Sequence, residues 1–222
     1  MLKPDVNRSS FDWRRRNMVS RLSRMGIWRE DVLDAMNRVP RHLFVEEALR
    51  SRAYDDMSLP LGLGQTISQP YTVAVMTQLM LGKTPVQNLQ RVLEIGTGCG
   101  YQTAVLQAVG LKQIYSVERL QPLHDKAKQH LRSAGFIGGT RMVCGDGYLG
   151  LPEVAPFDGI LVTAAPLEVP LPLLQQLAVG GRMVIPLDEG GHQYLWLIEK
   201  TEHGFHETCV QEAKFVPLIN GT

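Results

Sequence analysis

Apolar residues after position 90 recur with two alternating spacings, and this alternation predicts strands and helices in turn. Val92, Leu93 and Ile95 form a short apolar run with β-branched members, which predicts a buried strand. Glycines break the run immediately afterwards, and apolar residues then recur at helical spacing over 104–109. A second apolar run at 114–117 predicts the next strand.

The same order of elements continues toward the end of the sequence. Further strands are expected at 140–144, 157–163 and 182–187, with helices at 121–134 and 171–177 between them. The segments 194–201 and 205–218 are two more strand candidates, which we expect to form an antiparallel edge. Strands that alternate with helices and end in a hairpin are typical of an α/β fold with a doubly wound, mostly parallel sheet and helices on both faces.

The first 90 residues show a different pattern and are expected to form a helical N-terminal addition. Apolar residues recur at helical spacing over 18–25, 29–39 and 44–49. Residues 1–17 lack such periodicity, and we expect a flexible extension there. The length suits a single domain over 18–222, with a helical part at 18–90 and a core at 91–222.

Residues 59–70, LPLGLGQTISQP, have no regular period and precede a helix expected from Pro70 to Met80. Ser68 or Gln69 would lie near the N-cap of that helix, and Pro70 suits its first turn. A helix cap is therefore one interpretation of Ser68. Because the free amides at a helix start also attract anions, capping and ligand contact are compatible.

Composition and charge narrow the classes of function. A formal net charge of +1 argues against a general nucleic-acid-binding protein. Residues 1–30 nevertheless carry eight Lys and Arg against three Asp and Glu, which favours a solvated helix face or a loose tail over an RNA-binding arm. The three cysteines form no CxxC pair, so neither a metal site nor a disulfide framework is expected. No stretch resembles a signal peptide or a membrane span, and we expect a cytoplasmic protein.

Three acidic residues are placed where predicted strands meet their following turns. Glu94 stands within the run EIGTGCG, Glu118 ends the second strand, and Asp146 lies between two glycines after the third. Because the carboxyl ends of parallel strands meet at one edge of a sheet, we expect these carboxylates to converge on a crevice. Tyr101 stands where the dinucleotide fingerprint requires its last glycine, which argues against NAD. A cofactor with ribose hydroxyls, an amine and a cationic group would suit the three acids, and a turn without any ligand is the alternative.

Several segments resemble those of a known enzyme family. The segments similar to motifs of S-adenosylmethionine-dependent methyltransferases are VLEIGTGCGYQTAVL, YSVER, FDGILVTAAP and LLQQLAVGGRMVIPL. GQTISQP narrows the resemblance to the bacterial protein-L-isoaspartate O-methyltransferases, and VPRHLFV and KFVPL are similar to further segments of that family. The resemblance extends from about Met18 to Leu218. It implies a Rossmann-like fold and a protein repair reaction, in which S-adenosyl-L-methionine methylates the α-carboxylate of L-isoaspartyl residues and becomes S-adenosyl-L-homocysteine.

The resemblance also implies roles for residues at matching positions. Ser68 would donate its hydroxyl to the substrate carboxylate and is the expected catalytic residue. The residues expected to contact the cofactor are Gln65, Thr66, Ile67, Glu94, Gly96, Gly98, Gly100, Glu118, Asp146 and Gly147. Val216, Pro217 and Leu218 would hold an extended peptide substrate, and an edge-strand core is the open alternative for this run. An α-carboxyl group is ionised at neutral pH, so a general base is not required.

Two other classes of function remain open on the sequence. A methyltransferase acting on RNA or a small molecule would share the cofactor site, with basic N-terminal residues recruiting RNA, but GQTISQP has no nucleic-acid rationale. A non-catalytic cofactor-binding module would keep the fold, although the presence of Ser68, Glu118 and Asp146 argues against it. His203 and His206 are expected to be a surface pair, and no metal site is expected. We expect a monomer whose partners are isoaspartyl proteins and peptides, not nucleic acid or membrane.

Overall fold

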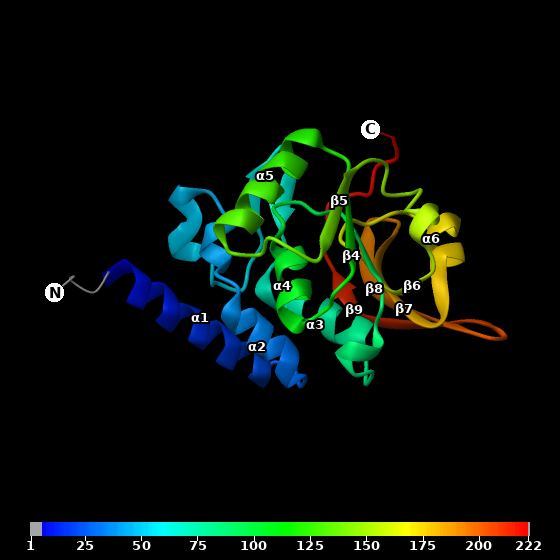
Figure 1. Ribbon diagram of the computed structural model, residues 1–222, viewed down its shortest axis with the longest axis horizontal. Helices are drawn as coiled ribbons and strands as arrows, with labels where there is room; N and C mark the ends of the chain where they lie inside the picture. The colour runs from blue at the N-terminus through cyan, green and yellow to red at the C-terminus, as the bar shows by residue number, and fades with distance from the viewer. Residues whose placement is uncertain (1–5, 222) are drawn as a thin grey trace.

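A seven-stranded sheet with helices on both faces forms the centre of the computed structural model, which describes residues 6–221 (Figure 1). The strand order is β5-β4-β3-β6-β7-β8-β9. The strands of this sheet are β3 (Val92–Ile95), β4 (Ile114–Glu118), β5 (Thr140–Cys144), β6 (Phe157–Val162), β7 (Leu177–Glu189), β8 (His192–Thr201) and β9 (Gly204–Ala213). Strands β3 to β7 pair in parallel, whereas β8 and β9 add in antiparallel fashion. The predicted doubly wound sheet with an antiparallel C-terminal element is confirmed.

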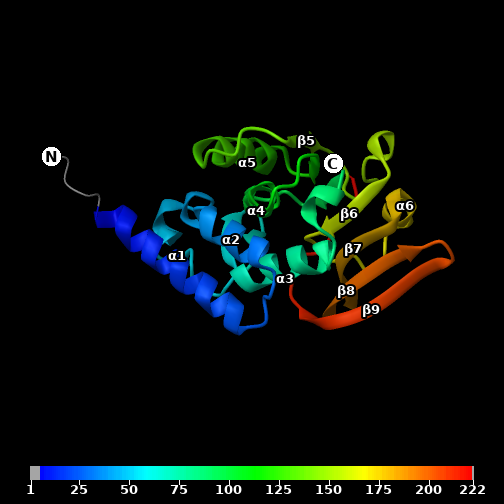
Figure 2. The same cartoon turned by 60° about the horizontal axis from the view of Figure 1, so that its bottom comes forward.

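The sheet separates two apolar cores. Helices α3 (Pro70–Leu81), α4 (Tyr101–Val109) and α5 (Gln121–Ser133) cover one face, and the short α6 (Leu171–Gln176) lies on the other (Figure 2). Neighbouring residues of β6 divide between the two sides, because successive side chains of a strand point to opposite faces. Leu161 belongs to the core beneath α3 and α4, while Ile160 belongs to the core beneath α6.

The chain reverses its direction of strand addition at β3. Strands β4 and β5 follow on one side of β3, and β6 and β7 are added on the other. In open parallel sheets, the loops at such a reversal diverge and leave a crevice outside the carboxyl ends of the strands. The fold therefore places a crevice where the glycine turn after β3 begins.

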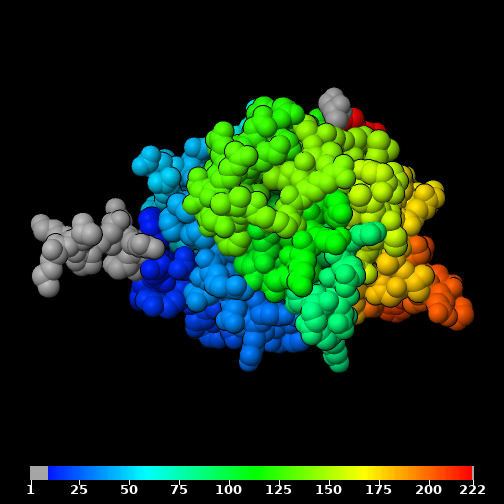
Figure 3. Space-filling view, viewed as in Figure 1, coloured from blue at the N-terminus to red at the C-terminus, as the bar shows by residue number. Residues whose placement is uncertain are grey.

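The N-terminal part is helical, but it begins earlier than the sequence suggests. Helix α1 (Val6–Arg24) includes most of the stretch 1–17 that we expected to be a flexible extension, while residues 1–5 lie outside the described residues. The remaining N-terminal elements are helix α2 (Glu30–Arg38) and the short 3-10 helices η1 (Arg41–Leu43) and η2 (Glu47–Arg52). Figure 3 shows the N-terminal part, in blue, directly against the green surface of the middle of the chain.

Tertiary contacts explain why α1 continues through a segment without amphipathic periodicity. Phe11 stacks on His42 with ring centroids 4.2 Å apart, and Met18 is fully buried. Arg14 and Arg21 donate hydrogen bonds to backbone carbonyls of residues 51 and 54. The extra turns of α1 are thus held by aromatic and arginine contacts rather than by an apolar stripe, and an apolar-periodicity search does not detect them.

The segment 59–70 contains regular structure that its sequence pattern does not predict. A small hairpin pairs β1 (Leu59–Gly62) with β2 (Gln65–Ile67) in antiparallel fashion. Gln69, rather than Ser68, occupies the N-cap of α3, and it makes no side-chain capping bond. The capping interpretation of Ser68 is therefore wrong, and its hydroxyl is available for another role. Two further 3-10 turns, η3 (Val86–Asn88) and η4 (Pro152–Val154), precede β3 and β6.

Candidate active site

A pocket of about 930 Å³, part of it open to solvent, lies at the carboxyl ends of β3, β4 and β6. Eleven predicted site residues line it, namely Gln65, Thr66, Ile67, Ser68, Gly96, Gly98, Glu118, Gly147, Val216, Pro217 and Leu218. The fold thus brings five segments that are separate in sequence to one cavity, and the predicted residues Glu94, Gly100 and Asp146 lie outside its wall.

The glycine turn after β3 supplies a wall made largely of backbone. Gly96 and Gly98 have φ of +90° and +55°, a region that residues with a Cβ rarely adopt. A Cβ on Gly96 would also lie 2.4 Å from Thr163 Oγ1, which donates hydrogen bonds to the carbonyls of Ile95 and Gly96. The turn is therefore fixed by Thr163 after β6, and a residue larger than glycine does not fit at position 96.

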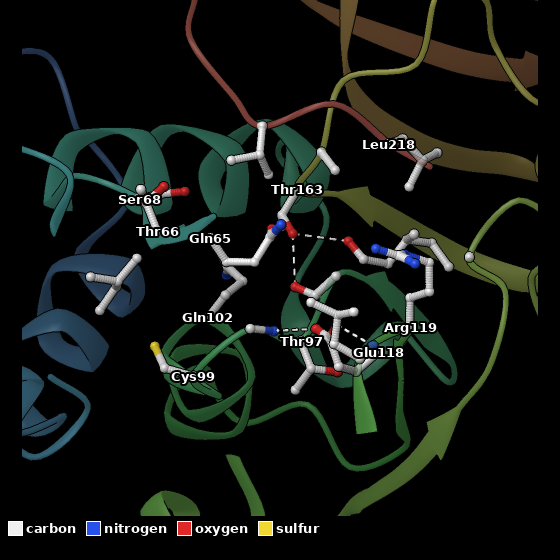
Figure 4. Close-up of a pocket in the computed structure, with 18 of the residues that line it drawn as sticks. Gln65, Thr66, Ser68, Thr97, Cys99, Gln102, Glu118, Arg119, Thr163 and Leu218 are labelled. Carbon is white, nitrogen blue, oxygen red and sulfur yellow. Dashed lines mark hydrogen bonds between the residues drawn. The ribbon is translucent and has the colours of Figure 1, made fainter. Parts of the chain in front are cut away.

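Glu118, at the end of β4, holds the far side of the glycine turn. Its carboxylate accepts hydrogen bonds from the backbone N–H of Gly98 at 2.8 Å and of Leu120 at 2.9 Å, as Figure 4 shows beside Thr97 and Arg119. The side chain is largely buried yet lines the pocket. Because an ionised carboxylate offers about four acceptor positions, Glu118 retains capacity for two ligand hydroxyls.

Glu94 lies beneath the glycine turn instead of in the pocket wall. It is fully buried, and one carboxylate oxygen accepts from the hydroxyls of Thr103 at 2.5 Å and Ser116 at 2.6 Å. Ser116 also bonds the hydroxyl of Thr97, a residue of the turn, at 2.6 Å. Burial raises the pKa of Glu94 to about 7, although the two hydroxyl donors oppose that rise. Glu94 thus supports the turn through Ser116, and Glu94 itself does not line the cavity.

Gly100 and Asp146 are likewise adjacent to the site but outside its wall. Gly100 is the N-cap of α4 with φ of +87°, and a Cβ there would lie 3.2 Å from Leu131 on α5. Asp146 accepts hydrogen bonds from the backbone N–H of Tyr148 at 2.8 Å and of Gly221 at 2.7 Å. Gly100 therefore permits close helix packing, and Asp146 ties the loop after β5 to the end of the chain.

The wall opposite Glu118 comes from β2 and the residues after it. Figure 4 shows Ser68 and Thr66 at one end of the cavity, with Glu118 and Leu218 at the other. Arg41 fixes this wall from behind, because its guanidinium donates to the Ser68 carbonyl at 2.6 Å and to the Ala53 carbonyl at 2.7 Å. Arg41 is fully buried and stacks over the ring of Tyr101, 4.6 Å from the centroid. Desolvation lowers the pKa of Arg41 from its usual value.

The last wall is the segment that follows β9. Ala165 donates its N–H to the Val216 carbonyl at 2.8 Å and accepts from the Leu218 N–H at 2.8 Å, which forms a parallel bridge to residue 217. Val216, Pro217 and Leu218 all line the pocket. This segment lies beyond the last strand of the sheet, so the edge-strand alternative for the run does not describe it.

Sequence reasoning missed several residues of the wall. The polar residues among them are Thr97, Cys99, Tyr101, Gln102, Arg119 and Thr163. Burial raises the pKa of the Cys99 thiol to about 11, so this group is neutral at physiological pH. Gln102 is held by a 2.9 Å hydrogen bond to Thr77 Oγ1. In the sequence, Tyr101 and Gln102 resemble ordinary residues of a helix start, and only the position of Thr163 after an apolar strand hints at the crevice.

Two other features bear on what the site contains. No group of three or more His, Cys, Asp and Glu side chains suited to a metal ion occurs within residues 6–221. His203 and His206 lie on the exposed β8–β9 hairpin, away from the pocket. Among residues 6–221, no helix has the length and apolar character needed to cross a membrane.

Comparison with known proteins gives the same family over nearly the whole chain. The family model described as Protein-L-isoaspartate(D-aspartate) O-methyltransferase matches residues 13–222. This chain belongs to that family. A protein-L-isoaspartate O-methyltransferase of Chromobacterium violaceum is 56% identical over 208 residues, which cover 93% of this chain and 90% of the relative. The family's protein from Pseudomonas aeruginosa is 49% identical, with 93% of this chain and 96% of the relative covered.

Solved structures of the family share the fold. One protein-L-isoaspartate O-methyltransferase has a TM-score of 0.80 at 30% identity, covering 91% of this chain and 65% of that longer chain. A putative family member from Plasmodium falciparum, solved in complex with S-adenosyl-L-homocysteine, also has a TM-score of 0.80, at 25% identity, and the match covers 93% of this chain and 99% of the other. The family resemblance of the sequence is therefore confirmed.

Proposed function

We propose that this chain is a protein repair enzyme that transfers a methyl group from S-adenosylmethionine to the α-carboxylate of L-isoaspartyl residues in damaged proteins and peptides. The observation that carries the proposal is the shared pocket. The glycine turn and Glu118 form one side of it, while Gln65 to Ser68 form the other. A cofactor held on the first side would face an acceptor held on the second, as a direct methyl transfer requires.

The first side fits the cofactor in shape and charge. S-adenosylmethionine supplies a methyl group on a sulfonium sulfur, which a carboxylate oxygen attacks directly. Glu118 has acceptor capacity left for the two ribose hydroxyls. Gly96 and Gly147 also line this side, and an added Cβ there would overlap Thr163 at 2.4 Å and Ile95 at 2.5 Å, so both positions require glycine. Glu94, Gly100 and Asp146 remain part of the proposed site as supports of the residues that touch the cofactor.

The second side needs to position the acceptor rather than activate it. An α-carboxylate is already ionised at neutral pH, and the neutral thiol of Cys99 offers no base in the wall. The Ser68 hydroxyl, which makes no capping bond, would donate to the acceptor carboxylate, and residues 216–218 would hold the peptide in extended form. Alignment of this kind contributes about 7 to 11 kcal/mol at best, so a rigid second wall matters for the rate.

The basic N-terminal residues give little support to RNA as the alternative substrate. Arg14 and Arg21 are engaged with backbone carbonyls of residues 51 and 54, and Arg15 pairs with Asp12 at 2.8 Å. Arg14 and Arg21 thus hold α1 to the domain, and Arg15 is paired within the helix itself. We extend the proposal to a monomeric, cytoplasmic enzyme that uses neither nucleic acid nor a membrane; light scattering tests the first part and cell fractionation the second.

Methyl transfer to matched peptides tests the proposed function. Labelled S-adenosylmethionine is supplied with an isoaspartyl peptide, with its aspartyl twin of the same sequence, and with bulk RNA. Incorporation into the isoaspartyl peptide alone is expected. Label in RNA alone, or equal label in the two peptides, would refute the proposal, and cofactor binding without any transfer would favour the non-catalytic module.

A further inference from the structure

Gln102, in the first turn of α4, is a polar residue of the pocket wall whose side-chain amide is only half used. The residue lines the cavity and is 7% exposed. Its Nε2 donates a hydrogen bond to Thr77 Oγ1 at 2.9 Å, whereas no donor among residues 6–221 bonds its Oε1. This oxygen is not sealed inside the protein, so it is accessible from the cavity. Because polar groups at this depth are normally hydrogen-bonded, a ligand in the pocket is the natural donor to Oε1.

The hydrogen bonds around Thr77 fix which way the Gln102 amide points. Thr77 is fully buried on α3, and its hydroxyl donates to the Val73 carbonyl at 2.7 Å. A hydroxyl has a single proton, so Thr77 Oγ1 can only accept from Gln102. The Nε2 of Gln102 must therefore face Thr77, and Oε1 is the amide atom that remains for a ligand.

The surroundings of Gln102 favour a neutral donor that is attached to an anion. Figure 4 shows Gln102 between Thr66, on the acceptor wall, and Cys99, in the glycine turn. The buried guanidinium of Arg41 stacks over the ring of the neighbouring Tyr101. Its positive charge disfavours a cationic donor, such as an ammonium group, and favours a carboxylate nearby. An amide N–H next to a carboxylate meets both requirements.

We propose that Gln102 Oε1 accepts a hydrogen bond from the backbone N–H of the isoaspartyl residue, and that this contact helps to select isoaspartyl over aspartyl substrates. The inference rests on the proposed function and deepens it by adding a specificity-determining residue. In an isoaspartyl residue, the same carbon atom carries both the N–H and the free carboxylate. In an aspartyl residue, the free carboxylate is one carbon further from the N–H. An acceptor fixed beside the carboxylate site fits the first arrangement better.

Two isoaspartyl peptides of the same sequence test the contact, one of them with an ester oxygen in place of that N–H. The ester peptide keeps the carboxylate and the shape of the substrate but has no proton to donate to Oε1. The wild-type chain should methylate the amide peptide with a kcat/KM roughly 3-fold to 10-fold higher, the effect of one hydrogen bond. Equal kcat/KM for the two peptides would overturn the inference without the use of any variant.

Gln102→Met removes the acceptor at similar side-chain volume. Its kcat/KM for the amide peptide should fall, and its ratio of amide to ester should approach one. Gln107→Met is the matched control, because Gln107 lies on the same helix and bonds Thr140 Oγ1 at 2.7 Å but is outside this pocket. The control should keep the wild-type ratio, and a wild-type ratio in Gln102→Met contradicts the assignment. If Gln102→Met does not fold, Thr77→Val takes its place, since loss of the anchor frees the amide to turn and should lower the ratio.

Cofactor binding distinguishes the possible failures. Calorimetry with S-adenosylhomocysteine should give the same affinity for the wild type and Gln102→Met. A loss of affinity in Gln102→Met, with the amide-to-ester ratio retained, would assign Oε1 to the cofactor's ammonium group and overturn the inference. If the wild-type chain methylates both peptides equally, the inference is wrong and the proposed function stands. If it methylates neither peptide, the proposed function fails and the inference fails with it.

Discussion

The guanidinium of Arg41 and the backbone carbonyl of Ser68 are joined by a 2.6 Å hydrogen bond across 27 residues of chain. The same guanidinium binds the Ala53 carbonyl and stacks over Tyr101, so one buried side chain connects η1, η2, the acceptor wall and the start of α4. None of the ion pairs found within residues 6–221 gives Arg41 a carboxylate partner. A buried, unpaired charge is costly to keep, so its retention beside Ser68 indicates a positioning role.

Replacement of Arg41 by methionine should therefore impair the acceptor side selectively. Methionine keeps most of the buried volume but removes both hydrogen bonds, so the Ser68 segment would lose its support. We expect kcat/KM for an isoaspartyl peptide to fall by up to about 100-fold, the effect of a misplacement near 1 Å. Calorimetry should find cofactor affinity little changed. An unaltered kcat/KM would contradict the positioning role.

Ser68→Ala should reduce turnover while sparing cofactor affinity. The hydroxyl is proposed to donate to the acceptor carboxylate, and a hydrogen bond to a charged group contributes about 1.5 to 3 kcal/mol. A fall in turnover of roughly 10-fold to 100-fold is expected on that basis. Ser133→Ala, on the exposed end of α5, is the matched control and should behave as the wild type. Equal turnover of all three proteins would remove Ser68 from the mechanism.

Glu118→Ala should weaken cofactor binding. The carboxylate is proposed to accept from the ribose hydroxyls, and it also holds the N–H groups of Gly98 and Leu120. A loss of about 1.5 to 3 kcal/mol in binding free energy is expected, measured by calorimetry with S-adenosylhomocysteine. Glu118→Gln keeps one acceptor oxygen, so its cofactor affinity should lie between that of the wild type and that of Glu118→Ala. Undiminished affinity in Glu118→Ala would exclude this residue from the cofactor site.

Glu94 should make the free energy of unfolding depend on pH. Its pKa is raised by burial from 4.5 to about 7, so the folded protein binds more protons than the unfolded chain between these values. The stabilising contribution is complete below pH 4.5 and is lost as pH rises through about 7. At about 1.4 kcal/mol per pKa unit, the loss is on the order of 3 kcal/mol. Urea unfolding of wild type and Glu94→Gln at about pH 5 and about pH 8 isolates the effect, and parallel pH profiles would contradict it.

Gly96→Ala should destabilise the fold through a steric overlap as well as backbone strain. The added Cβ would lie 2.4 Å from Thr163 Oγ1, and overpacking of this kind costs about 1 to 3 kcal/mol. Gly135→Ala is the matched control, because φ is similar at +85° and no atom lies within 4 Å of its added Cβ. The control should show only the backbone cost of about 1 to 2 kcal/mol. Thr163→Ala should partly rescue Gly96→Ala, and equal losses in the two glycine variants would refute the overlap.

Residues that form contiguous motifs were the part of the site that the sequence could predict. Gly96, Gly98 and Glu118 follow from strand–turn–helix spacing, and Gln65 to Ser68 follow from one family segment. The positions of Thr163 and Arg41 do not follow, because each reaches the site only through tertiary packing. Glu94 shows the opposite case, in which a motif position does not reveal where the side chain lies. The position of Glu94 next to the glycine turn suggests a ligand contact. Its side chain is instead fully buried on β3 and lies beneath the turn.

The fold was predictable where hydrophobic periodicity decides it. The alternation of strands and helices after residue 90 gave the sheet and its antiparallel edge, because burial on both faces imposes apolar runs. The first part of helix α1, residues 6–17, and the β1–β2 hairpin were not predicted from pattern. Phe11 and Arg14 stabilise α1 through contacts with residues 42 and 51, which no local pattern reveals.

The segments that enclose the pocket span the chain from Gln65 to Ile219, so ligand affinity and global folding are linked. A ligand that binds only this assembled cavity stabilises the folded state by about 2.7 kcal/mol when present at roughly a hundred times its Kd. Opening of the 216–219 segment alone would dismantle one wall, and saturating ligand would suppress that motion together with unfolding of the sheet. Cellular cofactor concentration would in this way set the lifetime of the enzyme against proteolysis.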